Sequence, residues 1–351
     1  MKTIVQKVNP ELFEDEELDK ACEILKAGGL VAIPTETVYG LGGDALSPEA
    51  AHKIYAAKGR PSDNPLIVHI ADMESLYNVA EEVSEKAKAL AEAFWPGPLT
   101  MIFPKKEKVP ASTTGGLNTV AVRMPAHPVA AALIRRSGVY IAAPSANTSG
   151  RPSPTKAEHV VEDMIDRIEM ILDGGQVGIG IESTIIDMTE DIPVILRPGY
   201  ITKAMIEEVI GEVEIDPAVI ATESKKDLVA KAPGMKYRHY APKGQLMIVE
   251  GDNAQVIEKI NALVQEKEAE HKKVAVIATE ESKALYQCKE VYSIGSRKSE
   301  GSIAAGLYDI LRQMDHIGAE YIYAESFTED TLGQAIMNRM LKAAGYHRMK
   351  A

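Results

Sequence analysis

The stretch Lys58-Gly59-Arg60-Pro61-Ser62-Asp63-Asn64-Pro65-Leu66 marks the point at which a helical pattern gives way to a strand pattern. Upstream, Ser47-Pro48-Glu49 is a helix start, with serine as N-cap and proline in the first turn, and Gly59 ends that helix. Downstream, Leu66 to Ile70 is a short apolar run typical of a buried strand. Gly59 and Pro61 do not favour regular secondary structure, so the residues around them are expected to form a loop. The stretch is therefore predicted to be a helix-to-strand loop in an alternating α/β chain.

Short apolar runs alternate with helical patterns on both sides of this loop. The helical patterns are Glu17–Lys26, Ser47–Lys58, Ser84–Trp95 and His127–Arg136, and the strand patterns are Leu30–Pro34, Leu66–Ile70, Leu99–Phe103, Val120–Met124, Val139–Ala143, Met170–Leu172, Thr184–Met188 and Val194–Arg197. Helices interleaved with short strands are typical of a sheet covered by helices. Residues 1–211 are therefore predicted to form an α/β domain with a twisted mixed sheet.

The pattern changes after residue 211. Residues 212–243 contain several prolines and follow no period, which predicts a linker that is long for a passive connection. Beyond it, strand patterns at 246–250, 274–278, 290–294 and 321–324 alternate with helical patterns at 253–268, 302–316 and 330–344. This βαβ alternation predicts a smaller second domain over residues 244–351, with a parallel, Rossmann-like sheet.

The composition is that of a globular protein. The chain has 351 residues, enough for two domains, of which 45% are apolar and 26% charged. Its formal net charge of -12 argues against wrapping nucleic acid but leaves room for a local basic groove. Cys22 and Cys288 form no disulfide framework or zinc motif. Without an apolar signal core or a membrane-length apolar window, a cytoplasmic location is expected.

Lys58 and Arg60 stand two residues apart in the helix-to-strand loop. If the segment is extended, their side chains point the same way and can converge on one ligand. A guanidinium fork beside an ammonium group suits a polyphosphate. Paired cations in a rigid loop of an acidic chain therefore suggest a local anion site. A solvated surface loop is the alternative.

Two further polar segments follow predicted strands. Pro34–Gly42 offers the hydroxyl groups of Thr35 and Thr37, with glycines that let a substrate approach the backbone, and Ala143–Gly150 is dense in short hydrogen-bonding side chains. Ligands of α/β sheets bind at strand ends, so both segments are predicted to meet the Lys58 loop at one rim of the sheet. A glycine-rich turn with capping threonines is the simpler alternative.

Arg123 and Arg197 each lie inside an apolar strand pattern. A buried arginine needs an anionic partner because its desolvation is costly. Two of them in one domain favour a bound carboxylate or phosphate, with structural ion pairs as the alternative. His69, also in a strand, is either a candidate base or a satisfied core residue. No Walker A motif is present, so ATP would not bind through a P-loop.

Within the linker, the run Ala232-Pro233-Gly234-Met235-Lys236-Tyr237-Arg238-His239-Tyr240-Ala241-Pro242 interleaves cations with aromatic residues. Such a run can bind RNA by stacking and charge. It can equally fold back as a rigid lid.

Several of these segments together resemble the threonylcarbamoyl-AMP synthases, a YrdC/YwlC-like family, in its long two-domain form. They are Pro34–Gly42, Lys58–Leu66, Pro144–Gly150, Ser183-Thr184 and Arg197-Pro198-Gly199, with Pro233–Pro242 as a marker of the long form. The resemblance covers nearly the whole chain. It implies an N-terminal YrdC-like domain and a smaller C-terminal Rossmann-like domain.

The resemblance implies an L-threonylcarbamoyladenylate synthase, a nucleotidyltransferase that forms threonylcarbamoyl-AMP and pyrophosphate from L-threonine, bicarbonate and ATP. A downstream tRNA threonylcarbamoyl transferase complex would then move the threonylcarbamoyl group to an adenosine of tRNA. Magnesium is expected to accompany the triphosphate, without dedicated metal ligands in the chain.

By matching motifs, the resemblance also assigns two sets of site residues. The threonine set is Thr37, His69, Arg123 and Ser183, and the ATP set is Lys58, Arg60, Asn64, Thr119, Ala143, Ser145, Ser153, Arg197 and, from the linker, Tyr237. Lys58 and Arg60 are the implied catalytic cations, which would neutralise charge at the α-phosphate. The linker is expected to close over the nucleotide as a lid, because the carbamate intermediate must be kept from water.

Two other functions compete with this interpretation. One is a module that binds RNA weakly through a basic groove of the same fold. The other is a carbamoyl-adenylate domain of the hydrogenase-maturation kind. The second is disfavoured because the acylphosphatase and zinc-finger segments that accompany it are missing from this chain.

Overall fold

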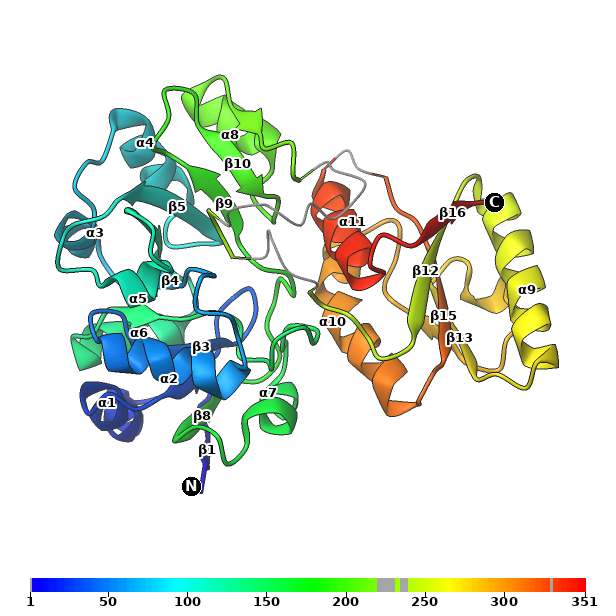
Figure 1. Cartoon of the computed structure of the whole chain (residues 1–351), viewed down its shortest axis with the longest axis horizontal. Coiled ribbons are helices and arrows are strands. Elements are labelled where there is room, and N and C mark those ends of the chain that lie inside the picture. The colour runs from blue at the N-terminus through cyan, green and yellow to red at the C-terminus, as the bar shows by residue number, and fades with distance from the viewer. Residues whose placement is uncertain (1, 220–230, 234–238, 329–330) are drawn as a thin grey trace. The chain divides into compact units, whose positions relative to one another are not determined.

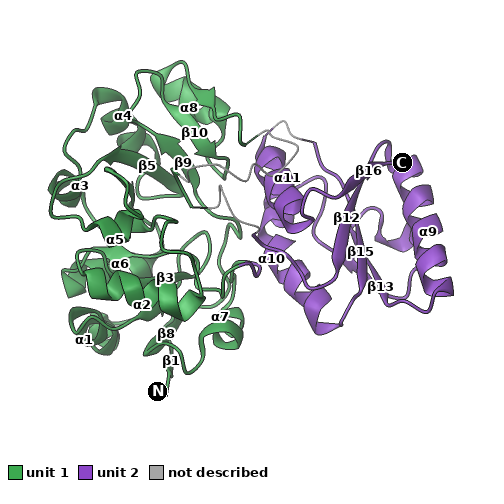
Figure 2. Ribbon diagram, in the orientation of Figure 1, with its two compact units in different colours: residues 1–149, 153–221, 225–236 green, residues 150–152, 222–224, 237–351 purple. Residues whose placement is uncertain are grey.

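The computed structural model describes residues 2–219, 231–233, 239–328 and 331–351. These residues form two compact units, which Figure 2 shows in green and purple. The first holds described residues 2–149, 153–219 and 231–233, and the second holds 150–152, 239–328 and 331–351. Each unit combines helices with a sheet of its own (Figure 1).

The first unit is built on a mixed sheet of eleven strands. They are β1 (Ile4–Lys7), β2 (Val31–Ile33), β3 (Gly40–Asp44), β4 (Ile67–His69), β5 (Leu99–Pro104), β6 (Thr119–Arg123), β7 (Ile141–Ala142), β8 (Met170–Asp173), β9 (Thr184–Asp187), β10 (Val194–Arg197) and β11 (Glu214–Ile215). Their order in the sheet is β1-β8-β2-β3-β7-β4-β6-β5-β9-β10-β11. At the centre β4 and β6 are parallel, whereas β7 and β5 on either side run antiparallel to them. The predicted mixed sheet is confirmed.

Helices connect these strands and cover the sheet. They are α1 (Asp19–Lys26), α2 (Pro48–Lys58), α3 (Met73–Val79), α4 (Glu85–Phe94), α5 (Ala111–Thr114), α6 (Pro128–Ser137), α7 (Ala157–Met164) and α8 (Lys203–Ile210). Helix α2 has the predicted boundaries: the Ser47 side chain accepts a hydrogen bond from the Ala50 amide, and Gly59 adopts a left-handed conformation, with φ 61° and ψ 36°. Only glycine takes up that conformation without cost, so Gly59 sets where the loop begins.

The central strands present two different faces. Side chains alternate along a strand, so Val120 and Val122 of β6 turn into the main core. Thr119, Ala121 and Arg123 turn to the opposite face. That face carries a smaller apolar cluster, made by Ile67, Ile102, Ala121, Ile185, Leu196 and Ala232. We call it the second face; several of the predicted site residues belong to it.

The glycine-rich segment after β2 is largely a strand. Residues Gly40–Asp44 form β3, antiparallel to β2. A Cβ atom at Gly42 would lie 2.8 Å from Ile141 Cγ2, and one at Gly40 would lie 3.1 Å from Ala143 Cβ. These glycines therefore allow close packing of β3, while their predicted role in letting a substrate approach the backbone stays a prediction.

The second unit is a parallel sheet of five strands between helices. Its strands are β12 (Gln245–Glu250), β13 (Val274–Ala278), β14 (Val291–Ser293), β15 (Tyr321–Glu325) and β16 (Arg348–Lys350), in the order β14-β13-β15-β12-β16. Helix α9 (Asn253–Ala269) covers one side, and α10 (Glu300–His316) and α11 (Leu332–Ala343) cover the other (Figure 1). The predicted Rossmann-like parallel sheet is confirmed.

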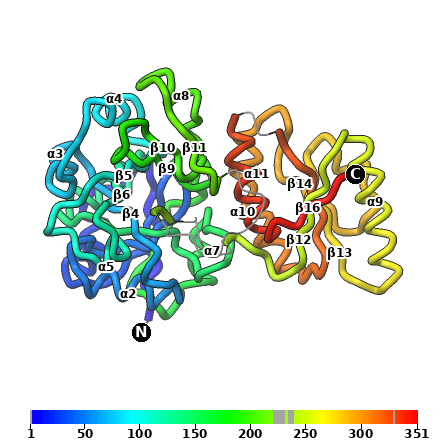
Figure 3. Tube along the Cα trace, turned by 45° about the horizontal axis from the view of Figure 1, so that its top comes forward, coloured from blue at the N-terminus to red at the C-terminus, as the bar shows by residue number. Residues whose placement is uncertain are grey.

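Four short strands escaped prediction: β1, β3, β11 and β16. Strand β11 lies within residues 212–243, the predicted linker, and pairs in parallel with β10 after helix α8; the green tube in Figure 3 traces this connection. Within the residues that the structure describes, no helix combines the length and the apolar character needed to cross a membrane.

A substitution at Gly199 tests the packing that positions Ser183 and Thr184 beside the second face. A Cβ atom there would lie 2.4 Å from the Thr184 amide nitrogen and 2.8 Å from the Ser183 carbonyl carbon, whereas a Cβ at Gly178 would meet nothing within 4 Å. We expect Gly199→Ala to lower the free energy of unfolding by about 1–3 kcal/mol through overpacking. The matched Gly178→Ala should change it by less than about 0.5 kcal/mol. Urea unfolding measures both, and equal stability of the two variants would contradict this packing account.

Candidate active site

Four polar side chains form a row across the second face. His69 ends β4 and Arg123 ends β6, and the two residues are register partners. Thr100 of β5 lies opposite Arg123 on its other side. The hydroxyl group of Ser183, just before β9, lies 2.8 Å from that of Thr100. Three residues predicted from separate motifs are thus adjacent, and Thr100, which the sequence analysis missed, lies between two of them.

The Arg123 guanidinium is the charged centre of this row. It is 4% exposed, and its Nη1 donates to the Thr37 hydroxyl at 2.9 Å while its Nε donates to the Gly97 carbonyl at 3.3 Å. Its Nη2 lies 2.6 Å from Oε1 of Glu36. The structural ion pair that was the alternative interpretation of Arg123 is therefore present, with Glu36 as its partner. A guanidinium has five N–H donors, so Arg123 still has N–H groups that a second carboxylate can use.

His69 is an uncharged group at neutral pH. Its Nδ1 lies 3.1 Å from the Ile67 carbonyl oxygen and 3.2 Å from that of Ile141, so Nδ1 bears the hydrogen of the neutral ring and Nε2 is left as an acceptor. Burial, together with the positive charge of Arg123, lowers the pKa of His69 to about 4. His69 can therefore accept a hydrogen bond from a substrate without adding charge to the site.

Arg197 links this row to the linker. Its Nε donates to the Ser183 carbonyl at 3.0 Å and its Nη2 to the Ser183 hydroxyl at 3.2 Å, so it fixes the residue predicted to contact threonine. Its Nη1 donates to the Pro233 carbonyl at 3.3 Å. The neighbouring Ala232 is fully buried in the apolar cluster of the second face. Ala232 and Pro233 of the linker thus lie on the face that carries the predicted site.

Lys58 and Arg60 both contact carbonyl oxygens. Lys58 is 3% exposed, and its ammonium group donates to the carbonyls of Ser145 and Asn147. Arg60 donates to the carbonyls of Asn64 and Pro65, at 3.3 and 3.1 Å for its Nη2. Because Lys58 ends a helix and Gly59 is left-handed, the segment is not extended, and the alternation argument for convergence of the two side chains was wrong.

The segment after β7 joins the Lys58 loop to the sheet. The Ala143 amide donates to the Ile67 carbonyl at 2.9 Å. The Ser145 hydroxyl donates to the Asn147 side-chain oxygen at 2.6 Å. Residue 145 therefore lies at the start of β4, whereas His69 ends that strand, and the two places are separated by roughly 10 Å at about 3.3 Å per residue. The Lys58 loop and Ser145 thus lie near the opposite end of β4 from His69, whereas Arg197 of the ATP set bonds Ser183 of the threonine set.

The remaining predicted ATP residues are more scattered. Asn64 is buried at the start of β4, and its Oδ1 has no hydrogen-bond partner among the described residues. Thr119 begins β6, at the other end of that strand from Arg123. Ser153 is fully buried and donates to Glu182 at 2.6 Å. Tyr237 lies outside the described residues.

The sequence analysis missed Glu36, Thr100, Asn147 and Glu182 as members of this region. Glu36 lies between Thr35 and Thr37, whose hydroxyl groups were predicted to face a substrate. This position was the only indication in the sequence that Glu36 belongs to the site. Thr100 had a clearer one, since it is a polar residue at an alternating position of an otherwise apolar strand.

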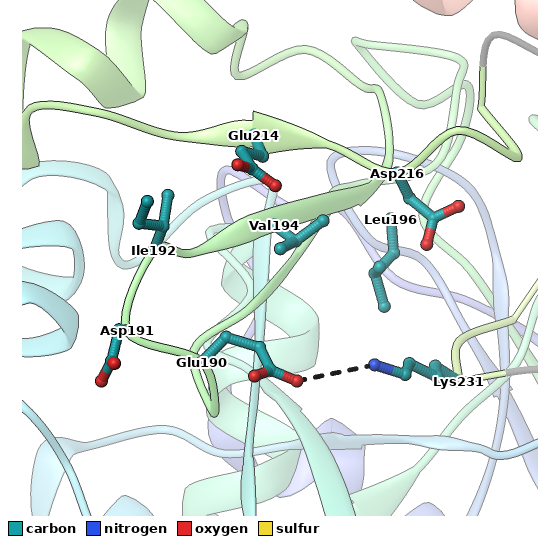
Figure 4. A pocket seen from close by; sticks show the side chains of 8 residues that line it. All are labelled: Glu190, Asp191, Ile192, Val194, Leu196, Glu214, Asp216 and Lys231. Atoms are coloured by element: carbon teal, nitrogen blue, oxygen red, sulfur yellow. Dashed lines mark ion pairs between the residues drawn. The ribbon is translucent and has the colours of Figure 1, made fainter.

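Two pockets that the structure contains do not suit a triphosphate. One, of about 390 Å³, lies along β10 and β11 and is lined by Glu190, Asp191, Ile192, Val194, Leu196, Glu214, Asp216 and Lys231 (Figure 4). Lys231 lies 3.8 Å from Glu190 and 3.7 Å from the buried Asp187, so carboxylates outnumber cations there. The other, of about 110 Å³, is in the second unit, where Arg297 is paired with Glu325 at 2.6 Å.

Comparison with known proteins identifies the family. The model described as "Telomere recombination" matches residues 23–199, and "Threonylcarbamoyl-AMP synthase, C-terminal domain" matches residues 201–345. A curated threonylcarbamoyl-AMP synthase of Pyrococcus abyssi is 51% identical over 348 residues, which cover 99% of both chains, and one of Bacillus subtilis is 51% identical over 94% of both. The crystal structure of P. abyssi Sua5 complexed with L-threonine is 50% identical, covers 99% of this chain and 100% of that one, and superposes with a TM-score of 0.94. The resemblance inferred from the motifs is confirmed: this chain belongs to the threonylcarbamoyl-AMP synthase family.

Proposed function

We propose that the second face of the first unit is where this chain makes threonylcarbamoyl-AMP, by adenylyl transfer from ATP to the carbamate of L-threonine. Membership of the family supports the activity, and a solved relative holds L-threonine. The observation that carries the assignment to this face is the row of His69, Arg123, Thr100 and Ser183. The reaction class is nucleotidyl transfer, since a carbamate oxygen attacks the α-phosphorus and pyrophosphate leaves.

The row is suited to L-threonine. Arg123 would bind the α-carboxylate, since charged hydrogen bonds in a buried site contribute roughly 1.5–3 kcal/mol each. Ser183 or Thr37 would bind the side-chain hydroxyl, and an amino acid without that hydroxyl would leave a buried polar group unpaired. His69, with Nε2 as an acceptor, completes the set. With these three proposed roles, threonine would lie at the end of β4.

The other end of β4 is suited to the nucleotide. Lys58 and Arg60 would exchange some of their carbonyl contacts for phosphate oxygens and stabilise the charge that grows as pyrophosphate leaves. Asn64, whose Oδ1 lacks a partner among the described residues, would complete this end, with Thr119, Ala143 and Ser145. Ser153 and Arg197, which contact Glu182 and Ser183, would bind the part of the nucleotide that lies nearer to threonine. Magnesium would be held by phosphate oxygens and water, because the described residues contain no group of three acidic, histidine or cysteine side chains able to hold a metal ion.

The linker is proposed as the lid of this site. Ala232 already packs on the apolar cluster, and the Pro233 carbonyl accepts a hydrogen bond from Arg197. A lid in this position would cover the carbamate and keep water from it. Tyr237, four residues further on, would then reach the nucleotide. Domain limits of 1–211, 212–243 and 244–351 remain predictions.

The downstream partner is proposed to be a tRNA threonylcarbamoyl transferase complex, in the cytoplasm, to which this chain supplies the adenylate. The deciding experiment is release of pyrophosphate from ATP, which we expect to require both L-threonine and bicarbonate. Pyrophosphate release without threonine would favour the carbamoyl-adenylate alternative. A tRNA gel shift at physiological salt, without that release, would favour the RNA-binding alternative.

The substitution Arg60→Ala tests whether ATP and L-threonine are bound by different residues of the site. Because Arg60 is assigned to ATP alone, we expect kcat/KM for ATP to fall by roughly 10- to 100-fold, the loss of one charged hydrogen bond or a little more. The dissociation constant for L-threonine should change less than about twofold. Arg135→Ala, which removes an exposed arginine of α6, is the matched control for both measurements. Equal losses for ATP and threonine would count against the assigned role.

Ala232→Asp tests the lid in the complete chain. A carboxylate cannot remain in the apolar cluster without a large desolvation cost, so the segment should leave the second face. We expect adenylate formation to fall at least about tenfold, equivalent to about 1.4 kcal/mol, with the unfolding temperature nearly unchanged. Ala93→Asp, on the exposed side of α4, should leave activity intact. Full activity of Ala232→Asp would rule out the lid.

A further inference from the structure

Three neighbouring side chains share an unusual number of unpaired atoms. Among the described residues, both carboxylate oxygens of Glu36, Nη2 of Arg123 and Nδ1 of His127 are buried without a hydrogen bond. Glu36 Oε1 lies only 2.6 Å from Arg123 Nη2, so the two charges are in contact although the N–H group is not aligned for a hydrogen bond. Two of these four atoms are thus paired by charge but make no hydrogen bond. Folded proteins rarely leave buried polar atoms without hydrogen bonds, so this cluster indicates a place for a ligand.

The protonation state of each side chain in this cluster follows from its surroundings. Desolvation alone would raise the pKa of Glu36, but the Arg123 guanidinium and the backbone amides of Glu36 and Ala126 outweigh it and hold that pKa below its usual value. Desolvation lowers the pKa of His127, against the opposing charge of Glu36. At neutral pH the cluster therefore consists of one cation, one anion and one neutral imidazole.

Such a pair is complementary to an α-amino acid. L-threonine at neutral pH carries a carboxylate and an ammonium group on one carbon. A zwitterion laid antiparallel to an Arg–Glu pair brings each of its charges against the opposite charge of the protein. It also offers a partner to Arg123 Nη2 and to the Glu36 carboxylate oxygens, which make no aligned hydrogen bond to other side chains. A guanidinium alone would leave the ammonium group desolvated and unpaired, which is costly.

Glu36 is also held in place by its backbone. The Ile179 amide donates to the Glu36 carbonyl at 2.9 Å, and the Gly180 amide donates to the Thr37 carbonyl at 3.0 Å. The next side chain, Thr37, accepts from Arg123. The loop therefore fixes Glu36 beside the guanidinium. The Glu36 side chain remains 16% exposed and Arg123 5% exposed, so a substrate can reach the pair from the Glu36 side.

Resting on the proposed function, we propose that Glu36 is a substrate-binding residue that holds the α-ammonium group of L-threonine while Arg123 holds the α-carboxylate. In the free enzyme Glu36 instead compensates the charge of Arg123. Threonine then changes the partners of both side chains without leaving any buried charge alone. Glu36 is thereby a specificity residue for α-amino acids against acids that lack the amino group.

The test compares two ligands on two proteins. Isothermal titration measures the binding of L-threonine and of (2S,3R)-2,3-dihydroxybutanoate, in which a hydroxyl replaces the amino group, to the unchanged chain and to Glu36→Gln. We expect Glu36→Gln to weaken threonine by at least about tenfold, the loss of a charged hydrogen bond, and to weaken the hydroxy acid by less than about threefold. Glu92→Gln, on the exposed surface of α4, is the matched control and should alter neither.

The outcomes are distinct. An equal loss for both ligands would mean that Glu36 only orients Arg123 and would overturn the proposal, as would unchanged threonine binding. If Glu36→Gln does not fold, Glu36→Asp, which keeps the charge, should preserve the preference for threonine over the hydroxy acid, and loss of that preference would overturn the proposal. Failure of the unchanged chain to bind threonine at all would instead refute the proposed function on which the inference rests.

Discussion

The burial of one guanidinium at the end of β6 determines the electrostatics of the whole site. Arg123 contacts the Glu36 carboxylate, the Thr37 hydroxyl and the Gly97 carbonyl. Its field contributes to keeping His69 neutral and Glu36 ionised. Burying a cation costs free energy unless an anion lies beside it. A ligand that displaces the Glu36 carboxylate from Arg123 must therefore bring a negative charge of its own.

The second face of the sheet provides the geometry for this charge. Alternation along β4, β5 and β6 places His69, Thr100 and Arg123 on the side away from the main core, which also carries the apolar residues Ile67, Ile102 and Ala121. An apolar floor with polar groups at both ends is the usual arrangement of a small-molecule site. The contact of Ala232 with that floor gives the linker a defined place on it, which composition alone did not suggest.

Much of the fold followed from local patterns. Apolar runs and caps located β2, β4, β5, β6, β8, β9 and β10 to within about two residues, because a buried strand between two polar breaks has few alternatives. The edge strands β1 and β11 and the glycine strand β3 escaped because their stability comes from neighbours. The three glycines of β3 give no β propensity, yet two of them, Gly40 and Gly42, allow the close packing against Ala143 and Ile141.

The motifs of the sequence by themselves determined the family and the alternation of helices and strands, since these depend on local order along the chain. Only the tertiary structure decided which residues meet. Register between β4, β5 and β6 aligned His69, Arg123 and Thr100, and a turn more than eighty residues away brought Glu36 to Arg123. Helix α2 ends at Lys58 and Gly59 is left-handed. The segment is therefore not extended, and the predicted convergence of the Lys58 and Arg60 side chains does not follow from alternation. Sequence spacing cannot show such contacts, because they depend on strand pairing and chain crossings between distant segments.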